Sequence, residues 1–202
     1  HLKDRVKAQI EGLVSQGILE PVSESQWASP LVLVKKPNGD VRICGDFRRL
    51  NAVTVPSVQV IPRIDDCLNR LAGVNWFTTI DLRQAYHQIP IREADRDKTT
   101  VTTEFGLHRY TSAPYGLKGI PHTFNRALAM ALSGVSPQVY IQYFDDILVL
   151  AKDLSEMHDN LREVLSHLQA AGFTVTLDKL RLCQQSVKFL GYIVSPEGVA
   201  CD

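Results

Sequence analysis

Two adjacent acids, Asp145 and Asp146, are the residues with the clearest chemical potential in this sequence. Apolar runs lie on both sides of them, over 139–142 and 147–151, and this pattern is typical of a β-hairpin with the acids at its tip. Carboxylates beside a hydrophobic core are destabilising unless a cation or a metal ion offsets their charge. Paired aspartate oxygens suit Mg²⁺, which in proteins binds one or two carboxylates together with substrate phosphates. The hairpin therefore predicts a Mg²⁺ site of the kind that phosphoryl transfer requires.

A third acid, Asp81, lies at the end of another strand-like segment. Residues 76–82 are rich in aromatic and β-branched side chains, which favours a strand, and Asp81 is their single acidic residue. A strand-end aspartate by itself is more often a structural cap than a catalyst. Because Asp145 and Asp146 supply two more acids, we expect three carboxylates to converge if the two strands are neighbours in one sheet.

The charge of the chain is balanced overall but uneven along the sequence. The chain has 22 Lys and Arg against 22 Asp and Glu, so its overall charge gives no support for nucleic-acid binding. Residues 35–49 nevertheless hold five basic residues against two acidic ones, mostly on a predicted hairpin that turns at Asn38-Gly39. Taken alone, these basic side chains are expected to be solvated charges on a sheet edge, where they prevent aggregation.

Composition indicates an ordinary soluble globular protein. Of its 202 residues, 45% are hydrophobic and 22% are charged. No apolar run approaches the length that spans a bilayer, and no signal-peptide pattern opens the chain. The 4 cysteines lack zinc-type spacing, which predicts reduced thiols in an intracellular protein. The chain ends without a terminal signal, so we expect it to be a piece of a longer protein.

The order of the predicted elements indicates an α+β fold. Apolar residues at helical spacing predict helices over 2–14, 64–71, 121–132 and 154–168. Asp153 and Glu156 form a capping pair at the start of the last helix. Beside the arms of the acidic hairpin, the predicted strands are 31–36, 41–43, 76–82, 173–177 and 187–194. Antiparallel hairpins with helices on one face are typical of α+β proteins.

Several separated motifs together resemble a known family. In chain order they are Trp27-Ala28-Ser29-Pro30, Val34-Lys35-Lys36, Arg42 with Asp46-Phe47-Arg48 and Leu50-Asn51, Asp81-Leu82 with Tyr86, Gly116-Leu117 before Pro121, Tyr143-Phe144-Asp145-Asp146, and Phe189-Leu190-Gly191-Tyr192. Each motif is weak alone. The ordered set, which runs from about Leu13 to the last residue, resembles the fingers and palm of a reverse transcriptase. The resemblance is stronger to gypsy-type long-terminal-repeat retrotransposons than to retroviral enzymes.

The resemblance implies a right-hand polymerase fold whose palm is an antiparallel sheet backed by helices, with the thumb absent. It implies fingers over residues 1–56 and 90–119, and palm over 57–89 and 120–202. The implied activity is that of an RNA-directed DNA polymerase, which transfers nucleotides to a primer 3′-hydroxyl with two Mg²⁺ ions, or with Mn²⁺ as a substitute. A fragment without a thumb is expected to grip its template weakly.

The implied partners are an RNA or DNA template with its primer, deoxynucleoside triphosphates and the rest of a polyprotein. That remainder would hold a thumb, a ribonuclease H, a protease and an integrase. The resemblance implies no membrane, and it implies an intracellular, cytoplasmic setting within a virus-like particle.

The family's functional residues fall on matching positions of this sequence. The catalytic and metal-binding acids match Asp81, Asp145 and Asp146. The nucleotide contacts match Lys36, Arg42, Leu82, Tyr86 and Tyr115. Within this set, the Leu82 carbonyl would complete a metal shell, Tyr86 would crowd a ribose 2′-hydroxyl, and Lys35 is a rival for Lys36. The primer and template contacts match Gly116, Tyr143, Leu190, Gly191 and Tyr192.

The sequence departs from the family pattern at three places, and none removes a metal ligand. Tyr115 stands where retroviral enzymes carry Gln and gypsy-type ones usually Phe, Gly45 stands where Val is usual, and 118–120 replaces Thr-Asn-Ala. Two alternatives stay open: a non-catalytic remnant that keeps the fold, and another palm-type nucleotidyltransferase such as a cyclase. The three intact acids disfavour the remnant, and the basic hairpin with the primer-grip-like strand disfavours the cyclase.

Overall fold

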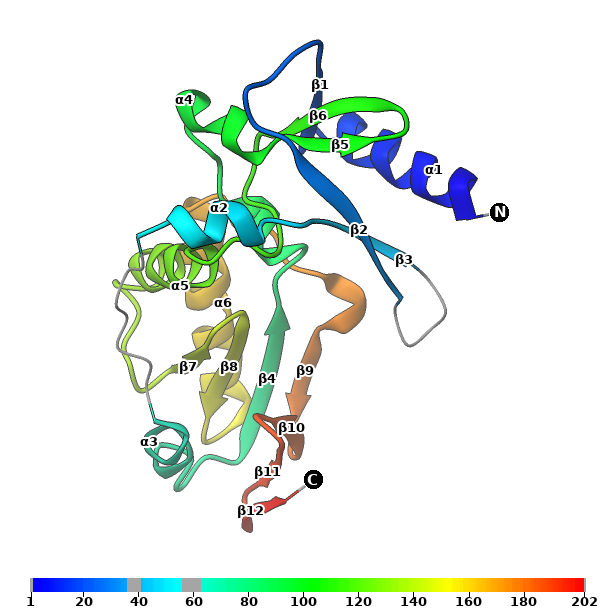
Figure 1. The fold of residues 1–202 in the computed structure, drawn as a ribbon. Coiled ribbons are helices and arrows are strands. Elements are labelled where there is room, and N and C mark those ends of the chain that lie inside the picture. The colour runs from blue at the N-terminus through cyan, green and yellow to red at the C-terminus, as the bar shows by residue number, and fades with distance from the viewer. Residues whose placement is uncertain (1, 36–40, 56–62, 202) are drawn as a thin grey trace. The chain divides into compact units, whose positions relative to one another are not determined.

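Contacts along the chain divide it into two units, each assembled from two separate stretches of sequence. Unit 1 comprises His1–Ser57 and Tyr86–His122, and unit 2 comprises Val58–Ala85 and Thr123–Asp202. The computed structural model describes residues 2–35, 41–55 and 63–201, and Figure 1 follows the chain through them. Helices and strands are mixed in both units, which confirms the predicted α+β class.

Unit 1 is organised around a five-stranded sheet with the strand order β1-β6-β5-β2-β3. Strand β2 pairs with β5 in parallel, and the other neighbours are antiparallel. Its elements are α1 (Leu2–Ser15), β1 (Leu19–Val22), β2 (Ser29–Lys35), β3 (Val41–Gly45), α2 (Arg48–Val53), α4 (Glu93–Arg96), η2 (Asp97–Thr99), β5 (Val101–Thr103) and β6 (Gly106–Tyr110). The short 3-10 helix η1 (Ala85–Gln88) begins at the boundary between the units.

Helix α1 buries an apolar stripe against this sheet. Val6 and Ile10 are buried and pack in one cluster with Ile43 of β3. The helix ends in a Schellman motif at Gly17, whose φ of 70° lies in the left-handed region that favours glycine. The predicted helix over 2–14 is confirmed.

Unit 2 is built on a four-stranded antiparallel sheet with the order β7-β8-β4-β9, followed by a three-stranded meander, β10-β11-β12. Its elements are α3 (Ile64–Asn69), β4 (Trp76–Asp81), α5 (Ile120–Ala131), β7 (Tyr140–Tyr143), β8 (Asp146–Ala151), α6 (Leu154–Ala170), η3 (Leu177–Lys179), β9 (Arg181–Gln184), β10 (Val187–Phe189), β11 (Tyr192–Ser195) and β12 (Gly198–Cys201). Figure 1 shows α6 behind β7 and β8, and α6 packs on β8 and β4, so a helix backs the sheet as predicted.

Strand β8 is buried on both faces, which explains its uninterrupted apolar sequence. Leu148 and Leu150 pack with Phe77 of β4 in one core cluster, to which α3 and the β10–β11 hairpin also contribute. On the opposite face Thr78 donates a hydrogen bond to Met157 Sδ of α6 at 3.2 Å. Because side chains alternate along a strand, α6 packs on one face of the sheet and α3 packs on the other.

The C-terminal part of the chain differs from the prediction. The predicted strand over 173–177 is wrong, because Val175 forms one isolated bridge and a 3-10 turn begins at Leu177. The predicted single strand over 187–194 is a hairpin instead. Leu190 and Gly191, with φ values of 53° and 82°, form the turn between β10 and β11. Apolar residues on both sides of that turn hide it in the sequence.

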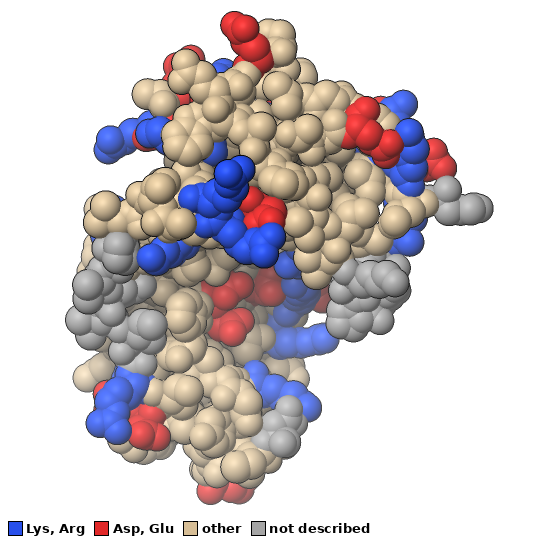
Figure 2. Space-filling model, in the orientation of Figure 1, with Lys and Arg blue, Asp and Glu red and all other residues tan. Residues whose placement is uncertain are grey.

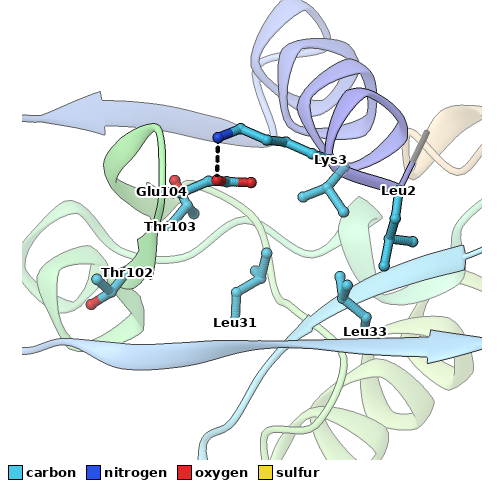
Figure 3. A pocket seen from close by; sticks show the side chains of 8 residues that line it. Leu2, Lys3, Leu31, Leu33, Thr102, Thr103 and Glu104 are labelled. Carbon is cyan, nitrogen blue, oxygen red and sulfur yellow. Dashed lines mark ion pairs between the residues drawn. The ribbon is translucent and has the colours of Figure 1, made fainter.

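An open hollow lies in unit 1 beside α1, with a volume of about 500 Å³. Figure 3 shows the apolar side chains of Leu2, Leu31 and Leu33 around it and the ion pair between Lys3 and Glu104 at its edge, 2.6 Å long. Among its described lining residues none is a predicted site residue, so the hollow is no part of the predicted active site.

The surface carries both signs of charge. Figure 2 shows Lys and Arg side chains interspersed with Asp and Glu on the face in view, which agrees with the 22 residues of each kind in the sequence. Within the described ranges, no helix has the length and apolar character that crossing a membrane requires.

Candidate active site

Asp81 is paired directly with Asp146 in the sheet of unit 2. Strands β4 and β8 are antiparallel, and their ladder places Asp81 opposite Asp146, one position beyond the Ile80–Ile147 pair. Directly opposed residues of an antiparallel pair project to the same face, with Cβ atoms about 4.5–5.5 Å apart. The register of two strands therefore brings two of the three predicted catalytic acids together.

Asp145 lies in the turn of the β7–β8 hairpin. Tyr143 pairs with Asp146, so Phe144 and Asp145 form the two-residue turn between them. Phe144 has a φ of 54°, a left-handed conformation that such turns need and that Gly or Asn usually supplies. A bulky residue in this conformation stores strain on the order of 1–3 kcal/mol. The Phe144 ring contacts the Tyr143 ring, with 5.1 Å between their centroids, and this contact offsets part of that strain.

Burial and, to a smaller extent, the neighbouring acids raise the pKa of Asp146. Loss of hydration is the largest cause, and the carboxylates of Asp145 and Asp81 add to it, whereas Lys179 acts in the opposite direction. Lys179 Nζ lies 3.1 Å from Asp81 Oδ2 and donates a hydrogen bond to it. A cation thus already neutralises one acid of the group, as expected for carboxylates beside a core.

A cavity of about 230 Å³ opens beside two of these acids. It is lined by Thr79, Ile80, Asp81, Asp146, Ile147, Lys179, Lys188, Phe189 and Leu190. The left-handed turn between β10 and β11 therefore brings Leu190, a predicted primer contact, to the same cavity as the acids. Gly191 completes that turn, and Tyr192 follows opposite Phe189.

Leu82 follows Asp81 at the end of β4. Its side chain is buried, and its backbone forms an isolated bridge with Val175. Next to it, the Asp81 carbonyl accepts a hydrogen bond from the Thr176 N–H at 2.8 Å. These contacts fix the backbone immediately after the first acid.

The acids of unit 2 supply the donor chemistry of a divalent cation without forming a closed ligand cluster. Across the described ranges, no group of three or more His, Cys, Asp or Glu side chains is arranged to hold an ion. Asp81 already accepts a hydrogen bond from the Lys179 ammonium. Carboxylate oxygens are also the hard ligands that divalent cations such as Mg²⁺ prefer. The residues that would hold an ion are Asp81, Asp145 and Asp146.

Three predicted nucleotide contacts gather within unit 1, around the ring of Tyr115. The Arg42 guanidinium lies over this ring, with Cζ 4.9 Å from the centroid. The Tyr86 ring lies 5.1 Å away, and the His87 ring lies 5.2 Å away in a T-shaped contact. Lys36 lies outside the described residues.

His87 connects this cluster to the segment between β6 and Tyr115. Its Nδ1 lies 3.0 Å from the Ala113 carbonyl oxygen, and the Ala113 N–H donates to the Ile89 carbonyl at 2.8 Å. Burial lowers the pKa of His87, the hydrogen bond to Ala113 opposes this, and the charge of Arg42 lowers it further. The imidazole is therefore neutral at pH 7.

Asn51 fixes the loop that carries Tyr115 and Gly116. Its Nδ2 donates to the Gly116 carbonyl at 2.8 Å, and its Oδ1 accepts from the Lys118 N–H at 2.8 Å. Gly116 has a φ of 94°, and a Cβ there would lie 3.5 Å from the Gly45 carbonyl oxygen. Glycine is therefore the residue that this loop path favours.

Sequence reasoning missed the roles of Lys179, His87 and Asn51. Lys179 reaches Asp81 because a 3-10 turn replaces the strand predicted there, and no periodic pattern announces such a turn. His87 has no neighbour in the sequence that indicates its contacts. Asn51 belongs to one of the quoted motifs, and that motif was its only signal.

Comparison with known sequences identifies the family. The family described as "Reverse transcriptase (RNA-dependent DNA polymerase)" matches residues 34–194. The Retrovirus-related Pol polyprotein from transposon opus of Drosophila melanogaster is 38% identical over 207 residues, which is 100% of this chain and 20% of that protein. The corresponding polyprotein from transposon gypsy of the same organism is 33% identical over 207 residues, again 100% of this chain and 20% of that protein. The chain thus spans about a fifth of these relatives.

Solved structures agree with the sequence relatives. The foamy viral protease-reverse transcriptase dRH in complex with ds DNA matches with a TM-score of 0.91 and 27% identity, over 99% of this chain and 35% of that chain. The foamy viral protease-reverse transcriptase in complex with RNA/DNA hybrid matches with a TM-score of 0.90 and 26% identity, over 100% and 27%. The predicted resemblance and the fingers-palm fold are confirmed. The chain belongs to the reverse transcriptase family, whose members here include the Pol polyproteins of gypsy-type retrotransposons.

Proposed function

We propose that this chain is the catalytic part of an RNA-directed DNA polymerase that extends a primer on an RNA or DNA template with Mg²⁺. The observation that carries the proposal is the direct pairing of Asp81 with Asp146 across β4 and β8, with Asp145 next to it in the turn. Three acids at one end of a sheet destabilise the fold unless a cation offsets their charge, and burial together with the charges of Asp145 and Asp81 raises the pKa of Asp146.

The acids and the neighbouring residues have distinct roles in this proposal. Asp81, Asp145 and Asp146 would hold the divalent ions, with the Leu82 carbonyl as a further ligand. Bound ions supply positive charge that activates the primer hydroxyl and neutralises the leaving pyrophosphate. The protein contributes alignment: Leu190, whose side chain lines the cavity of Asp81 and Asp146, supports the primer end together with Gly191.

The nucleotide side of the site is assigned to unit 1. Arg42 binds the triphosphate together with Lys36 or Lys35, and Tyr86 crowds the ribose 2′-hydroxyl so that deoxynucleotides are preferred. The contact of Arg42 and Tyr86 with one ring, that of Tyr115, supports a shared role for the two. Gly116, Tyr143 and Tyr192 complete the primer and template contacts.

The domain names, the partners and the setting belong to the same proposal. We assign fingers to residues 1–56 and 90–119 and palm to 57–89 and 120–202, and the two contact-defined units support this division. The remainder of a Pol polyprotein, with thumb and ribonuclease H, would act with this chain in cytoplasmic virus-like particles. The polyprotein names of the relatives support this assignment.

Primer extension tests the proposed activity. In a protein extended by a thumb, we expect Mg²⁺-dependent extension of oligo(dT) on poly(rA), and we expect Asp145→Asn to reduce the rate by at least about 100-fold, as losing an electrostatic catalytic group commonly does. Asp159→Asn is a matched control, because Asp159 lies on α6 with 77% of its side chain exposed. Unchanged extension by Asp145→Asn would contradict the metal assignment.

A further inference from the structure

The ring of Tyr115 lies under Arg42, which is assigned to nucleotide binding. A role for this contact rests on the proposed polymerase function. We propose that Tyr115 is a positioning residue that orients the Arg42 guanidinium for the nucleotide triphosphate through a cation–π contact. The distance from Arg42 Cζ to the ring centroid is 4.9 Å, within the roughly 6 Å over which such contacts attract. Tyr115 therefore acts on the nucleotide through Arg42.

Arg42 needs such a support because its neighbours on the strand do little to hold its side chain in place. It lies on β3 opposite Val34, and its side chain is exposed. Within the described part of the chain no carboxylate forms an ion pair with it. An exposed arginine loses much rotamer freedom when it binds a ligand, and a ring face that already restricts it reduces that loss.

The ring of Tyr115 is itself held from two sides, so it offers one face in one orientation. Tyr86 packs on it with an interplanar angle of 49°, and His87 meets it at 85°. The two hydrogen bonds of Asn51 fix the backbone of the same loop at Gly116 and Lys118. A ring that is fixed by its neighbours can position a mobile side chain.

This role depends on the ring and not on the hydroxyl group. Phenylalanine keeps the face on which a guanidinium stacks. Glutamine and leucine have no ring. The inference therefore predicts that Tyr115→Phe preserves the effect of Tyr115, whereas Tyr115→Gln and Tyr115→Leu remove it.

The test is a double-mutant cycle on the KM for dTTP in the full-length protein that contains this chain. Tyr115→Leu and Tyr115→Gln should each raise KM about 2- to 5-fold, the range of a cation–π contact at an exposed site, with kcat little changed. Tyr115→Phe should restore KM to the wild-type range. In an Arg42→Gln background, Tyr115→Leu should add no further increase, because residues that act through one contact are not additive.

A matched control removes a ring beneath another cation. Phe105→Leu deletes a ring in the turn between β5 and β6 that lies 5.7 Å from Lys3 Nζ, and it should leave KM unchanged. Arg42 side-chain NMR shifts supply a readout that needs no activity: a ring-current shift should be present in wild type and Tyr115→Phe and lost in Tyr115→Leu.

Two results would overturn the inference. One is an additive KM increase in the double variant, which would make Tyr115 an independent nucleotide contact. The other is an unchanged KM or unchanged Arg42 shifts in Tyr115→Leu. These failures differ from failure of the proposed function, in which Asp145→Asn would extend primers as wild type does.

Discussion

Replacing Asp146 by Asn should stabilise the protein when no divalent ion is bound. The pKa of Asp146 is raised in the folded state, so the folded protein binds this proton more readily than the unfolded chain. The ionised carboxylate therefore destabilises the fold at neutral pH, and that loss disappears as the pH falls through the raised pKa. Like charges directly opposed on neighbouring strands destabilise a sheet by up to about 1 kcal/mol. For a chain of this size, a gain of about 0.5–1 kcal/mol raises the melting temperature by about 1–4 °C.

With divalent ions bound, wild type should have a higher melting temperature than Asp146→Asn. An ion that binds only the folded state at ten times its Kd stabilises it by about 1.4 kcal/mol. Wild type should gain this stability if Asp81, Asp145 and Asp146 hold the ion as proposed, whereas Asp146→Asn would lack one ligand and should gain much less.

Thermal unfolding followed by circular dichroism measures both effects, first with EDTA and then over a MgCl₂ series at constant ionic strength. Asp159→Asn serves as the control, since its side chain is exposed on α6 and should change neither value. A lower melting temperature of Asp146→Asn in EDTA would refute the electrostatic reasoning. A full response of Asp146→Asn to Mg²⁺ would refute the assignment of Asp146 as a ligand.

Two further substitutions test the packing of unit 1. Gly45→Val should lower the free energy of unfolding in urea by about 1–3 kcal/mol, because overpacking a core has this effect. The reason is that a Cβ at Gly45 would lie 2.4 Å from the ring of buried Phe47, whereas Gly119→Ala, with nothing within 4 Å, should be nearly neutral. His87→Gln should flatten the loss of stability between pH 7 and pH 5. Because burial lowers the pKa of His87, the unfolded chain binds the proton first, and stability falls as the pH drops below the unfolded value of about 6.5, by at most about 1.4 kcal/mol per pH unit. An equal pH slope in His87→Gln, or a Gly45→Val protein as stable as wild type, would contradict these explanations.

Elements with long periodic patterns could be predicted from the sequence. Helix α6 keeps its apolar stripe over many turns, and Asp153 caps it by accepting from the Glu156 N–H at 2.9 Å. The Glu156 carboxylate accepts from the Lys152 N–H at 2.7 Å, one residue before the Asp153 N–H that a capping box would use. The acidic hairpin was predictable for a similar reason, since apolar strands flank it on both sides.

Features that depend on a single backbone conformation could not be predicted in this way. Leu190 adopts a left-handed φ, which leucine rarely does, so the hairpin around it looks like one continuous strand. The approach of Lys179 to Asp81 joins residues far apart in the chain, and a single sequence carries no signal of such a contact. The ring cluster around Tyr115 depends in the same way on tertiary packing.

The tight connection between β7 and β8 has an evolutionary consequence. With Tyr143 paired to Asp146 and two residues between them, this connection has no spare length. One inserted or deleted residue in β8 would exchange the side chains on its two buried faces and turn Asp146 away from Asp81. Descendants of this gene should therefore vary in residue type along 140–151 while keeping its length, and an active copy with an altered length there would need a second, compensating change in β4.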